Sequence, residues 1–178
     1  KREMRRSGAL IGAMMIHRGE ADCMLCGTFA QPREHLPYIR EVIGLRAGAS
    51  VFASLNILLL PNRTLFICDT HINLDPSAEQ VAEMAIMAAE EVQRFGIVPK
   101  LALLSHSSFG SFDNASAVKM KRARELLAQM APALEMEGEM HGDAAISESL
   151  RTQVFPDSRL KGEANLLLKC VEKEPRKA

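Results

Sequence analysis

A capped helical stretch between two short apolar runs constrains the fold of this chain more than any other feature. Residues 64–69 form an apolar run rich in β-branched side chains, which is typical of a buried strand. Asp75 and Pro76 then offer a helix cap and a first helical residue, and Gly96 offers a stop for a helix running from Pro76 to Phe95. A second apolar run follows at residues 101–104. The order strand, helix, strand predicts a layered α/β domain.

The rest of the chain continues this alternation. Residues 51–60 and 64–69 are separated only by the turn Pro61–Arg63, so we expect an antiparallel hairpin, because parallel pairing needs a longer crossover. The fold class that follows is α/β: a three-layer α/β/α sandwich with a mixed, mostly parallel sheet. Further strands are predicted at residues 21–26, 135–140 and 164–168, and further helices at residues 3–18, 34–43, 116–130 and 143–154.

Composition excludes several classes of partner. The 178 residues are 47% hydrophobic and 25% charged, which suits one packed domain with a charged tail near the C-terminus. Lys and Arg together number 22, as do Asp and Glu, and aromatic residues are few, so nothing favours nucleic-acid binding. No apolar run approaches the roughly 20 residues of a membrane helix. We therefore expect a cytoplasmic protein that binds neither nucleic acid nor membrane.

The four cysteines favour structural roles. Cys23, Cys26, Cys68 and Cys170 lie among apolar neighbours, which is typical of buried, reduced thiols. Cys23 and Cys26 form a CxxC, but on a strand their side chains would point to opposite faces, and no second CxxC completes a zinc site. A metal or redox role for the pair is the less favoured alternative.

Candidate chemistry lies at the predicted strand ends. The serine-rich segment 105–111 follows a strand and precedes a helix, where open α/β sheets offer amides and hydroxyls to phosphate or carboxylate groups. A simple turn and helix cap is an equally good interpretation. His71, His106 and His141 also follow predicted strands, and they could share one sheet edge, although hydrogen-bonding histidines are favoured over a zinc site. Ser105 and His106 are adjacent and would face apart, so a serine hydrolase is not indicated.

Two further polar segments have structural and functional interpretations. Asn73 and the pair Glu79–Gln80 are explained by a turn and by the first turn of a helix, where a carboxylate is favoured. The segment from Lys161 to Asn165 could bind an anion through its lysine, or could simply use Gly162 for a close approach of the backbone.

A series of short motifs runs along the chain in order: Met14-Met15 with Ala21-Asp22; Cys26-Gly27-Thr28; Leu59-Leu60-Pro61; Asp69…Asn73…Pro76…Ala78-Glu79-Gln80; Leu104-Ser105-His106-Ser107…Gly110-Ser111; Gly138…Met140…Asp143-Ala144-Ala145; and Gly162…Ala164-Asn165. Together these motifs resemble the phosphate acetyl/butyryltransferase family. Within that family, Phe29–Leu36 and the segment Met140-His141-Gly142-Asp143 depart from active phosphotransacetylases and resemble the C-terminal domain of bacterial multidomain NADP-dependent malic enzymes.

The resemblance implies a domain like the second lobe of isocitrate and isopropylmalate dehydrogenases. Residues 1–168 would form the inserted lobe, and residues 169–178 a charged tail. The family's other lobe and its catalytic residues would lie outside this chain, so the resemblance assigns no catalytic residue and no metal ligand here. A regulatory domain that senses acetyl-CoA and supports oligomer assembly is the leading expectation. An active phosphate acetyltransferase, or an oligomerisation lobe without a ligand, are the alternatives.

The resemblance also implies a binding cleft and partners. Acetyl-CoA or acetyl phosphate would bind in a cleft between lobes, whereas NADP and a divalent metal would belong to malic-enzyme domains elsewhere in the protein. No cofactor is expected in this chain, and a homo-oligomer is. The residues expected on this side of the cleft are Gly27, Thr28, Ser105, Ser107, Gly110 and Ser111.

Overall fold

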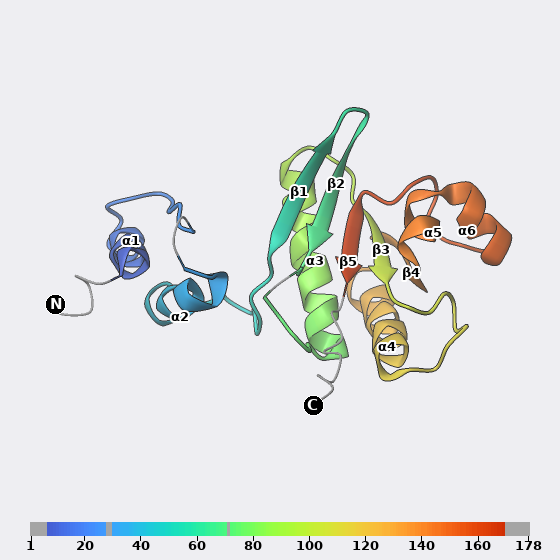
Figure 1. The fold of residues 1–178 in the computed structure, drawn as a ribbon, viewed down its shortest axis with the longest axis horizontal. Coiled ribbons are helices and arrows are strands. Elements are labelled where there is room, and N and C mark those ends of the chain that lie inside the picture. Colours follow the sequence, from blue (N-terminus) through green and yellow to red (C-terminus); the bar gives the residue numbers. More distant parts are fainter. Residues whose placement is uncertain (1–6, 28–29, 71, 170–178) are drawn as a thin grey trace. The chain divides into compact units, whose positions relative to one another are not determined.

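The structure is a computed structural model that describes residues 7–27, 30–70 and 72–169. Its contacts divide the chain into two compact units, and the boundary along the sequence lies between Ser50 and Val51. The first unit contains helices α1 and α2, and the second contains strands β1–β5 and helices α3–α6 (Figure 1). The assignment of residues 1–168 to one lobe and of residues 169–178 to a tail stays a prediction. None of the described helices is both long and apolar enough to cross a membrane.

The first unit contains the two helices predicted within residues 3–18 and 34–43. Helix α1 (Gly8–His17) begins after Ser7, whose side chain accepts a hydrogen bond from the Leu10 amide at 3.2 Å. It ends before Gly19, which adopts a positive φ of 70°. Helix α2 (Pro32–Val42) has proline at its first position, where the missing N–H costs nothing. The two helices contact each other.

The predicted strand at residues 21–26 is wrong. The structure has an irregular segment there, with Leu25 fully exposed and both Cys23 and Cys26 exposed. A strand needs a neighbouring strand to satisfy its backbone, and none of the described residues of the first unit forms one. The expectation that these two thiols are buried fails with the strand.

The hairpin is confirmed. Strands β1 (Leu55–Leu60) and β2 (Arg63–Cys68) pair antiparallel, with Leu60 opposite Arg63 across a two-residue turn. The sheet order is β1-β2-β5-β3-β4, and β2, β5, β3 and β4 are all parallel. The sheet is therefore mixed and mostly parallel, as predicted, with strands β3 (Lys100–Leu104), β4 (Glu135–Met140) and β5 (Leu166–Lys169) completing it.

Helix α3 (Ala78–Arg94) has a different cap from the predicted one. Ser77 caps it, because its side chain accepts from the Gln80 amide at 3.3 Å while the Gln80 side chain accepts from the Ser77 amide at 2.9 Å. Asp75 instead pairs with Lys119, and this hydrogen bond lowers the pKa of the Asp75 carboxyl. Pro76 lies before the helix, which starts at Ala78, and the helix stops just before Gly96, whose φ is 74°.

Three layers are present in the second unit (Figure 1). Helices α3 and α4 (Ala115–Met130) cover one face of the sheet, where side chains such as Phe66, Leu101 and Leu166 form the main core. On the other face, a smaller core around Met140 and Leu167 takes in residues of α5 (Gly142–Ile146). The α/β/α sandwich predicted from the sequence is confirmed, whereas its likeness to isocitrate or isopropylmalate dehydrogenases stays a prediction.

The predicted helix at residues 143–154 is two helices. Helix α5 ends at Ile146, Ser147 has extended backbone angles, and α6 (Glu148–Val154) begins directly after it. The Ser147 hydroxyl accepts from the Leu150 amide at 3.4 Å, so the serine caps a new helix instead of continuing the old one. Strand β5 starts at Leu166, two residues later than predicted, and the Asn165 side chain bonds the backbone of Lys100 and Val98.

Cysteine reactivity tests this part of the fold. Cys68 is fully buried on β2, and burial raises the pKa of its thiol to about 12, whereas Cys23 and Cys26 are exposed. In a Cys170→Ser variant of the native chain at about pH 8, iodoacetamide should label Cys23 and Cys26, and Cys68 only after unfolding in urea. Peptide mass spectrometry gives the count, and rapid native labelling of Cys68 would contradict the core.

Candidate functional site

The candidate site is the segment 105–111, which we call the serine loop. It joins the carboxyl end of β3 to the region before α4, and it lies beside the carboxyl end of β4. The Ser105 amide donates to the Met140 carbonyl at 3.0 Å, and the Phe109 amide donates to the Glu139 carbonyl at 2.8 Å. The loop is thus fixed to the neighbouring strand, at the edge where open α/β sheets bind ligands.

Three predicted serines lie together in this loop. Ser107 is completely buried, and its hydroxyl lies 3.5 Å from the Ser111 hydroxyl and accepts from the Phe112 amide at 3.1 Å. Ser105 accepts from the Ser107 amide at 3.2 Å, and the Ser111 hydroxyl accepts from the Ser108 amide at 2.9 Å. Ser107 and Ser111 therefore shape the loop, and the partly exposed Ser105 hydroxyl donates to no acceptor among the contacts of the described residues.

Glu139 of β4 holds the serine loop in place, and no sequence pattern predicted this role. The side chain is 3% exposed, and its Oε1 accepts from the Ser107 hydroxyl at 3.0 Å and from the Gly110 amide at 2.6 Å. The sequence predicted that the Ser107 hydroxyl and the Gly110 amide would face the phosphate or carboxylate of a ligand. In the structure they donate instead to the carboxylate of Glu139. In this structure the Ser107 hydroxyl and the Gly110 amide are therefore both bonded within the protein.

The two described histidines of the predicted cluster also belong to this edge. The His141 ring Nε2 lies 2.8 Å from the His106 carbonyl oxygen, and the His141 amide donates to the Ser108 hydroxyl at 3.1 Å. His141 is therefore a hydrogen-bonding residue that joins β4 to the loop. His71 lies outside the described residues. Among the residues that the structure describes, no three His, Cys, Asp or Glu side chains gather as a metal site would require.

A small pocket opens beside the loop. Phe109 and Phe155 stack with ring centroids 4.4 Å apart, and the pocket of about 120 Å³ next to them is also lined by Gly110 and the basic residues Lys121 and Arg124 of α4. Arg124 pairs with the buried Glu137 at 3.1 Å, and Lys121 is exposed. The exposed lysine places a positive charge at the rim of the serine loop.

The other predicted site residues are not brought to this loop by any described contact. Gly27 belongs to the first compact unit, where it is exposed and has a φ of 132°. Thr28 lies outside the described residues. The structure therefore groups Ser105, Ser107, Gly110 and Ser111 and leaves the place of Gly27 and Thr28 in a shared cleft as a prediction.

The structural interpretation of Asn73 is supported by its contacts. Its side-chain amide donates to the Phe52 carbonyl at 2.8 Å and to the buried Asp69 carboxylate at 3.0 Å. Asp69 has a φ of 55°, so the amide also steadies a left-handed turn between β2 and α3. The Gln80 side chain caps helix α3. In this arrangement the side chains of Asn73 and Gln80 are both used within the domain.

The segment before β5 is likewise structural. The Lys161 carbonyl accepts from Lys100 Nζ at 2.6 Å, and its amide donates to Glu135 at 2.7 Å. Gly162 has a φ of 71°, and its amide donates to Glu148 at 2.8 Å. The close approach of the backbone that glycine allows is therefore used within the domain.

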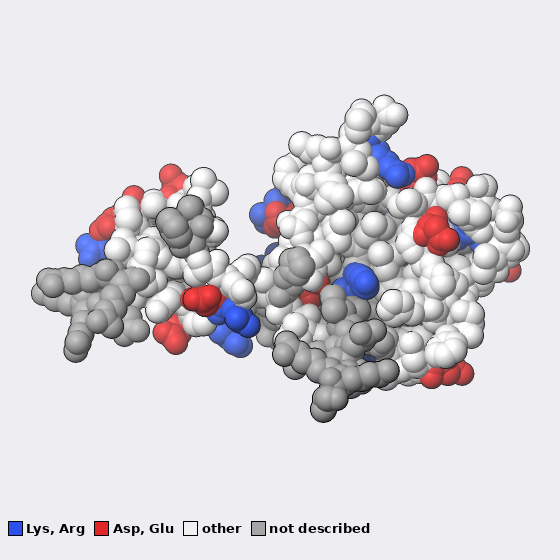
Figure 2. Space-filling view, in the orientation of Figure 1, with Lys and Arg blue, Asp and Glu red and all other residues white. Residues whose placement is uncertain are grey.

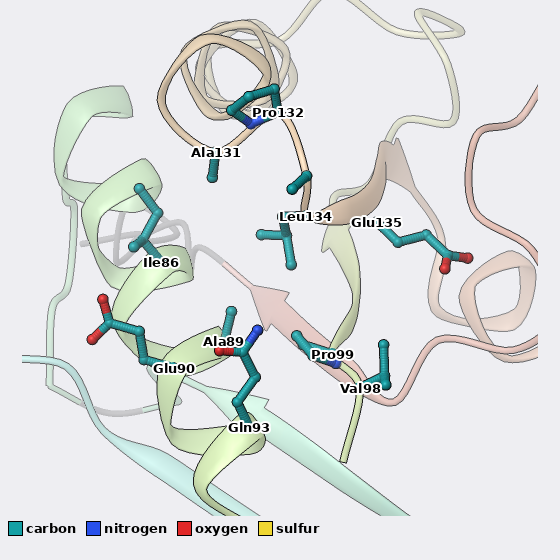
Figure 3. A pocket seen from close by; sticks show the side chains of 11 residues that line it. Ile86, Ala89, Glu90, Gln93, Val98, Pro99, Ala131, Pro132, Leu134 and Glu135 are labelled. Atoms are coloured by element: carbon teal, nitrogen blue, oxygen red, sulfur yellow. The ribbon is translucent and has the colours of Figure 1, made fainter. Parts of the chain in front are cut away.

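An apolar pocket of about 350 Å³ lies at the opposite, amino end of the strands (Figure 3). Ile86 and Ala89 of α3 face Pro132 and Leu134 of the link between α4 and β4, and Glu90, Gln93 and Glu135 stand around them. Its distance from the strand ends that carry the serine loop argues against a shared ligand.

Removing the Ser107 hydroxyl tests the organisation of the loop. Ser107→Ala should lower the free energy of unfolding by about 1–3 kcal/mol, because the buried Glu139 carboxylate and the Phe112 amide each lose a partner. Ser149→Ala, a change at an exposed serine of α6, should lie within about 0.5 kcal/mol of the parent. Urea unfolding gives both values, and equal values would show that the loop contacts contribute nothing.

Comparison with known proteins gives one family. The family model described as phosphate acetyl/butaryl transferase matches residues 1–169. The NADP-dependent malic enzyme of Salmonella typhimurium is 51% identical over 168 residues, covering 94% of this chain and 22% of that protein. The phosphate acetyltransferase of Synechocystis is 34% identical over 157 residues, covering 88% of this chain and 22% of that protein.

A solved structure supports the same grouping. A phosphotransacetylase from Streptococcus pyogenes superposes with a TM-score of 0.85 at 30% identity, covering 95% of this chain and 52% of that one. The chain thus spans about a fifth of the Salmonella malic enzyme and about half of this phosphotransacetylase. In the malic enzymes the matched region is the C-terminal part.

Proposed function

Because the chain belongs to the phosphate acetyl/butyryl transferase family, we propose that it is the regulatory, acetyl-CoA-sensing domain of an NADP-dependent malic enzyme. The observation that carries this proposal is the difference in identity: 51% to the Salmonella malic enzyme against 34% to the Synechocystis phosphate acetyltransferase, over nearly the same residues. In this role the chain carries out no reaction of its own. Malate oxidation, NADP and a divalent metal belong to malic-enzyme domains outside it, and the setting is the cytoplasm.

The serine loop is the proposed contact with acetyl-CoA in this unit. The Ser105 hydroxyl and the exposed Lys121 are the groups that can reach a phosphate or carbonyl oxygen, and the Phe109–Phe155 pair gives the adjoining pocket an apolar wall. Glu139 holds the loop in shape through Gly110 and Ser107. A homo-oligomer is part of the same proposal.

Titration calorimetry of acetyl-CoA into the complete gene product tests the proposal. The parent protein should bind, and Glu139→Gln should weaken binding at least tenfold, because the neutral amide holds the Gly110 and Ser107 donors less firmly. Glu125→Gln, a change at an exposed carboxylate of α4, should leave the affinity unchanged. Ser105→Ala removes a partly exposed hydroxyl, so it checks the loop without disturbing the core.

Two outcomes would contradict this assignment. Absence of binding by the parent protein would rule out acetyl-CoA sensing and leave an oligomerisation lobe without a ligand. Equal affinity of the Glu139→Gln, Ser105→Ala and Glu125→Gln variants would place the ligand away from the serine loop.

Active phosphate acetyltransferase is the second candidate. The observation in its favour is the Streptococcus phosphotransacetylase, which matches 95% of this chain with a TM-score of 0.85. Under this alternative, the complete gene product would form acetyl-CoA from acetyl phosphate and CoA. Release of phosphate in that assay, without malate-dependent reduction of NADP, would favour the transferase over the regulatory domain.

A further inference from the structure

The small pocket beside the serine loop contains a carboxylate oxygen that lacks a donor. Glu139 lines this pocket and is only 3% exposed. Its Oε1 accepts from the Ser107 hydroxyl and the Gly110 amide, whereas the contacts of the described residues give Oε2 no donor. Oε2 is not one of the fully enclosed polar atoms without a partner, so it keeps access to the pocket. A buried carboxylate oxygen is costly to leave unpaired, so this position favours a ligand group that donates a hydrogen bond.

The wall of the pocket suits a flat ring. Phe109 and Phe155 both line it, and their rings are stacked 4.4 Å apart at an interplanar angle of 13°. Gly110 and Gly138 leave part of the wall without side chains. A volume of about 120 Å³ suits one ring system, since pockets for whole ligands are larger. Aromatic side chains in such walls bind nucleobases by stacking.

Two cations stand at the edge of the same pocket. Lys121 is exposed, and Arg124 donates through Nη1 to Glu137 at 3.1 Å, which leaves further guanidinium N–H groups. Among the contacts of the described residues, neither cation donates to Glu139. In the view of Figure 2, the surface over the segment that joins β3 to α4, traced in Figure 1, is mostly uncharged. The pocket therefore suits a neutral ring that carries a phosphate at its outer end.

The unpaired oxygen of Glu139 selects among ring systems. Adenine carries an amino group that donates hydrogen bonds, whereas guanine and hypoxanthine carry an accepting oxygen at the same ring position. Such an oxygen would face the Glu139 carboxylate, and two acceptors leave each other unpaired. Among the bases with an amino group, adenine is the one that acetyl-CoA contains.

We propose that this pocket holds the adenine ring of acetyl-CoA, with the amino group of the ring donating to Glu139 Oε2 and the phosphates lying near Lys121. This inference rests on the proposed function for the identity of the ligand. It adds that the domain recognises the nucleotide end of the molecule, so acetyl phosphate, which has no adenine, is not recognised in this pocket.

Titration calorimetry of adenosine monophosphate (AMP) and inosine monophosphate (IMP) into the complete gene product tests the pocket without the acetyl group. The parent protein should bind AMP at least tenfold more tightly than IMP, because the two nucleotides differ only in the group that faces Glu139. Glu139→Gln should remove this preference, since an amide can both accept from adenine and donate to hypoxanthine. A change in loop shape alone would weaken both nucleotides alike. Glu125→Gln, at an exposed carboxylate of α4, should keep the preference.

Competition with acetyl-CoA then identifies the source of the adenine. AMP should raise the apparent dissociation constant of acetyl-CoA in proportion to its own occupancy. Absence of AMP binding, or equal affinities for AMP and IMP in the parent protein, would overturn the inference even if acetyl-CoA binds. Selective AMP binding that leaves the affinity for acetyl-CoA unchanged would overturn the assignment of the ring to acetyl-CoA. Selective AMP binding by a protein that does not bind acetyl-CoA would support the adenine pocket and contradict the proposed function.

Discussion

Arg151→Lys is expected to lower the free energy of unfolding by about 3 kcal/mol or more. Arg151 is completely buried, and its two terminal nitrogens donate to backbone carbonyls of separate segments: Nη1 to Ala144 at 2.9 Å, and Nη2 to Leu160 at 3.0 Å and also to Gly162. The planar fork of arginine reaches both segments at once. A lysine ammonium reaches only one, so a buried carbonyl loses its partner and the charge stays poorly solvated.

The contacts of Arg151 explain the size of this effect. The side chain ties the end of α5 to the segment that leads into β5, and no described carboxylate pairs with it. The control is Arg122→Lys, at a side chain that is 54% exposed and pairs with Glu125, which should change stability by no more than about 0.5 kcal/mol. Urea unfolding followed by circular dichroism gives both values. If Arg151→Lys and Arg122→Lys both changed the free energy of unfolding by a small and equal amount, the buried guanidinium would not be a structural link.

Gly138→Ala should destabilise the chain by about 3 kcal/mol or more, through a clash between β4 and its neighbour β3. A Cβ at this position would lie 2.7 Å from both the Cβ and the carbonyl oxygen of Leu103 on the neighbouring strand. The Gly138 φ of 150° is also one that other residues rarely adopt. Neither obstacle can move cheaply, because one is backbone and the other is fixed in the core.

Gly142→Ala is the matched control for this change. A Cβ at Gly142 meets nothing within 4 Å, and the residue begins α5 with ordinary helical geometry. Thermal unfolding should show a clear fall in Tm for Gly138→Ala and a value near that of the parent for Gly142→Ala. Because Glu139 follows Gly138, a stable, folded Gly138→Ala chain would mean that the edge of β4 and the serine loop can rearrange, contrary to the geometry described above.

The fold was predictable where local signals and burial agreed. The hairpin followed from the turn Pro61–Arg63 between two apolar runs, and α3 followed from Pro76 and Gly96, although the cap proved to be Ser77. The strand expected at residues 21–26 failed because an apolar run does not reveal whether a partner strand is available.

The candidate site was predictable in position and not in its internal chemistry. The place of the serine loop follows from a strand end before a helix, which the residue pattern contains. Glu139 could not be found in this way, because a carboxylate in a strand looks like a solvent-facing residue until the sheet buries it under Ser107 and Gly110. His141 similarly acquires its role only through the parallel pairing of β3 and β4.

We propose above that this domain senses acetyl-CoA on behalf of a malic enzyme. The most direct measurement is the rate of malate-dependent NADP reduction by the complete gene product, with and without acetyl-CoA, alongside the same protein carrying Glu139→Gln. Acetyl-CoA should slow malate oxidation by the parent protein, and should slow the variant only at concentrations at least tenfold higher. A rate that is indifferent to acetyl-CoA in the parent protein would contradict it.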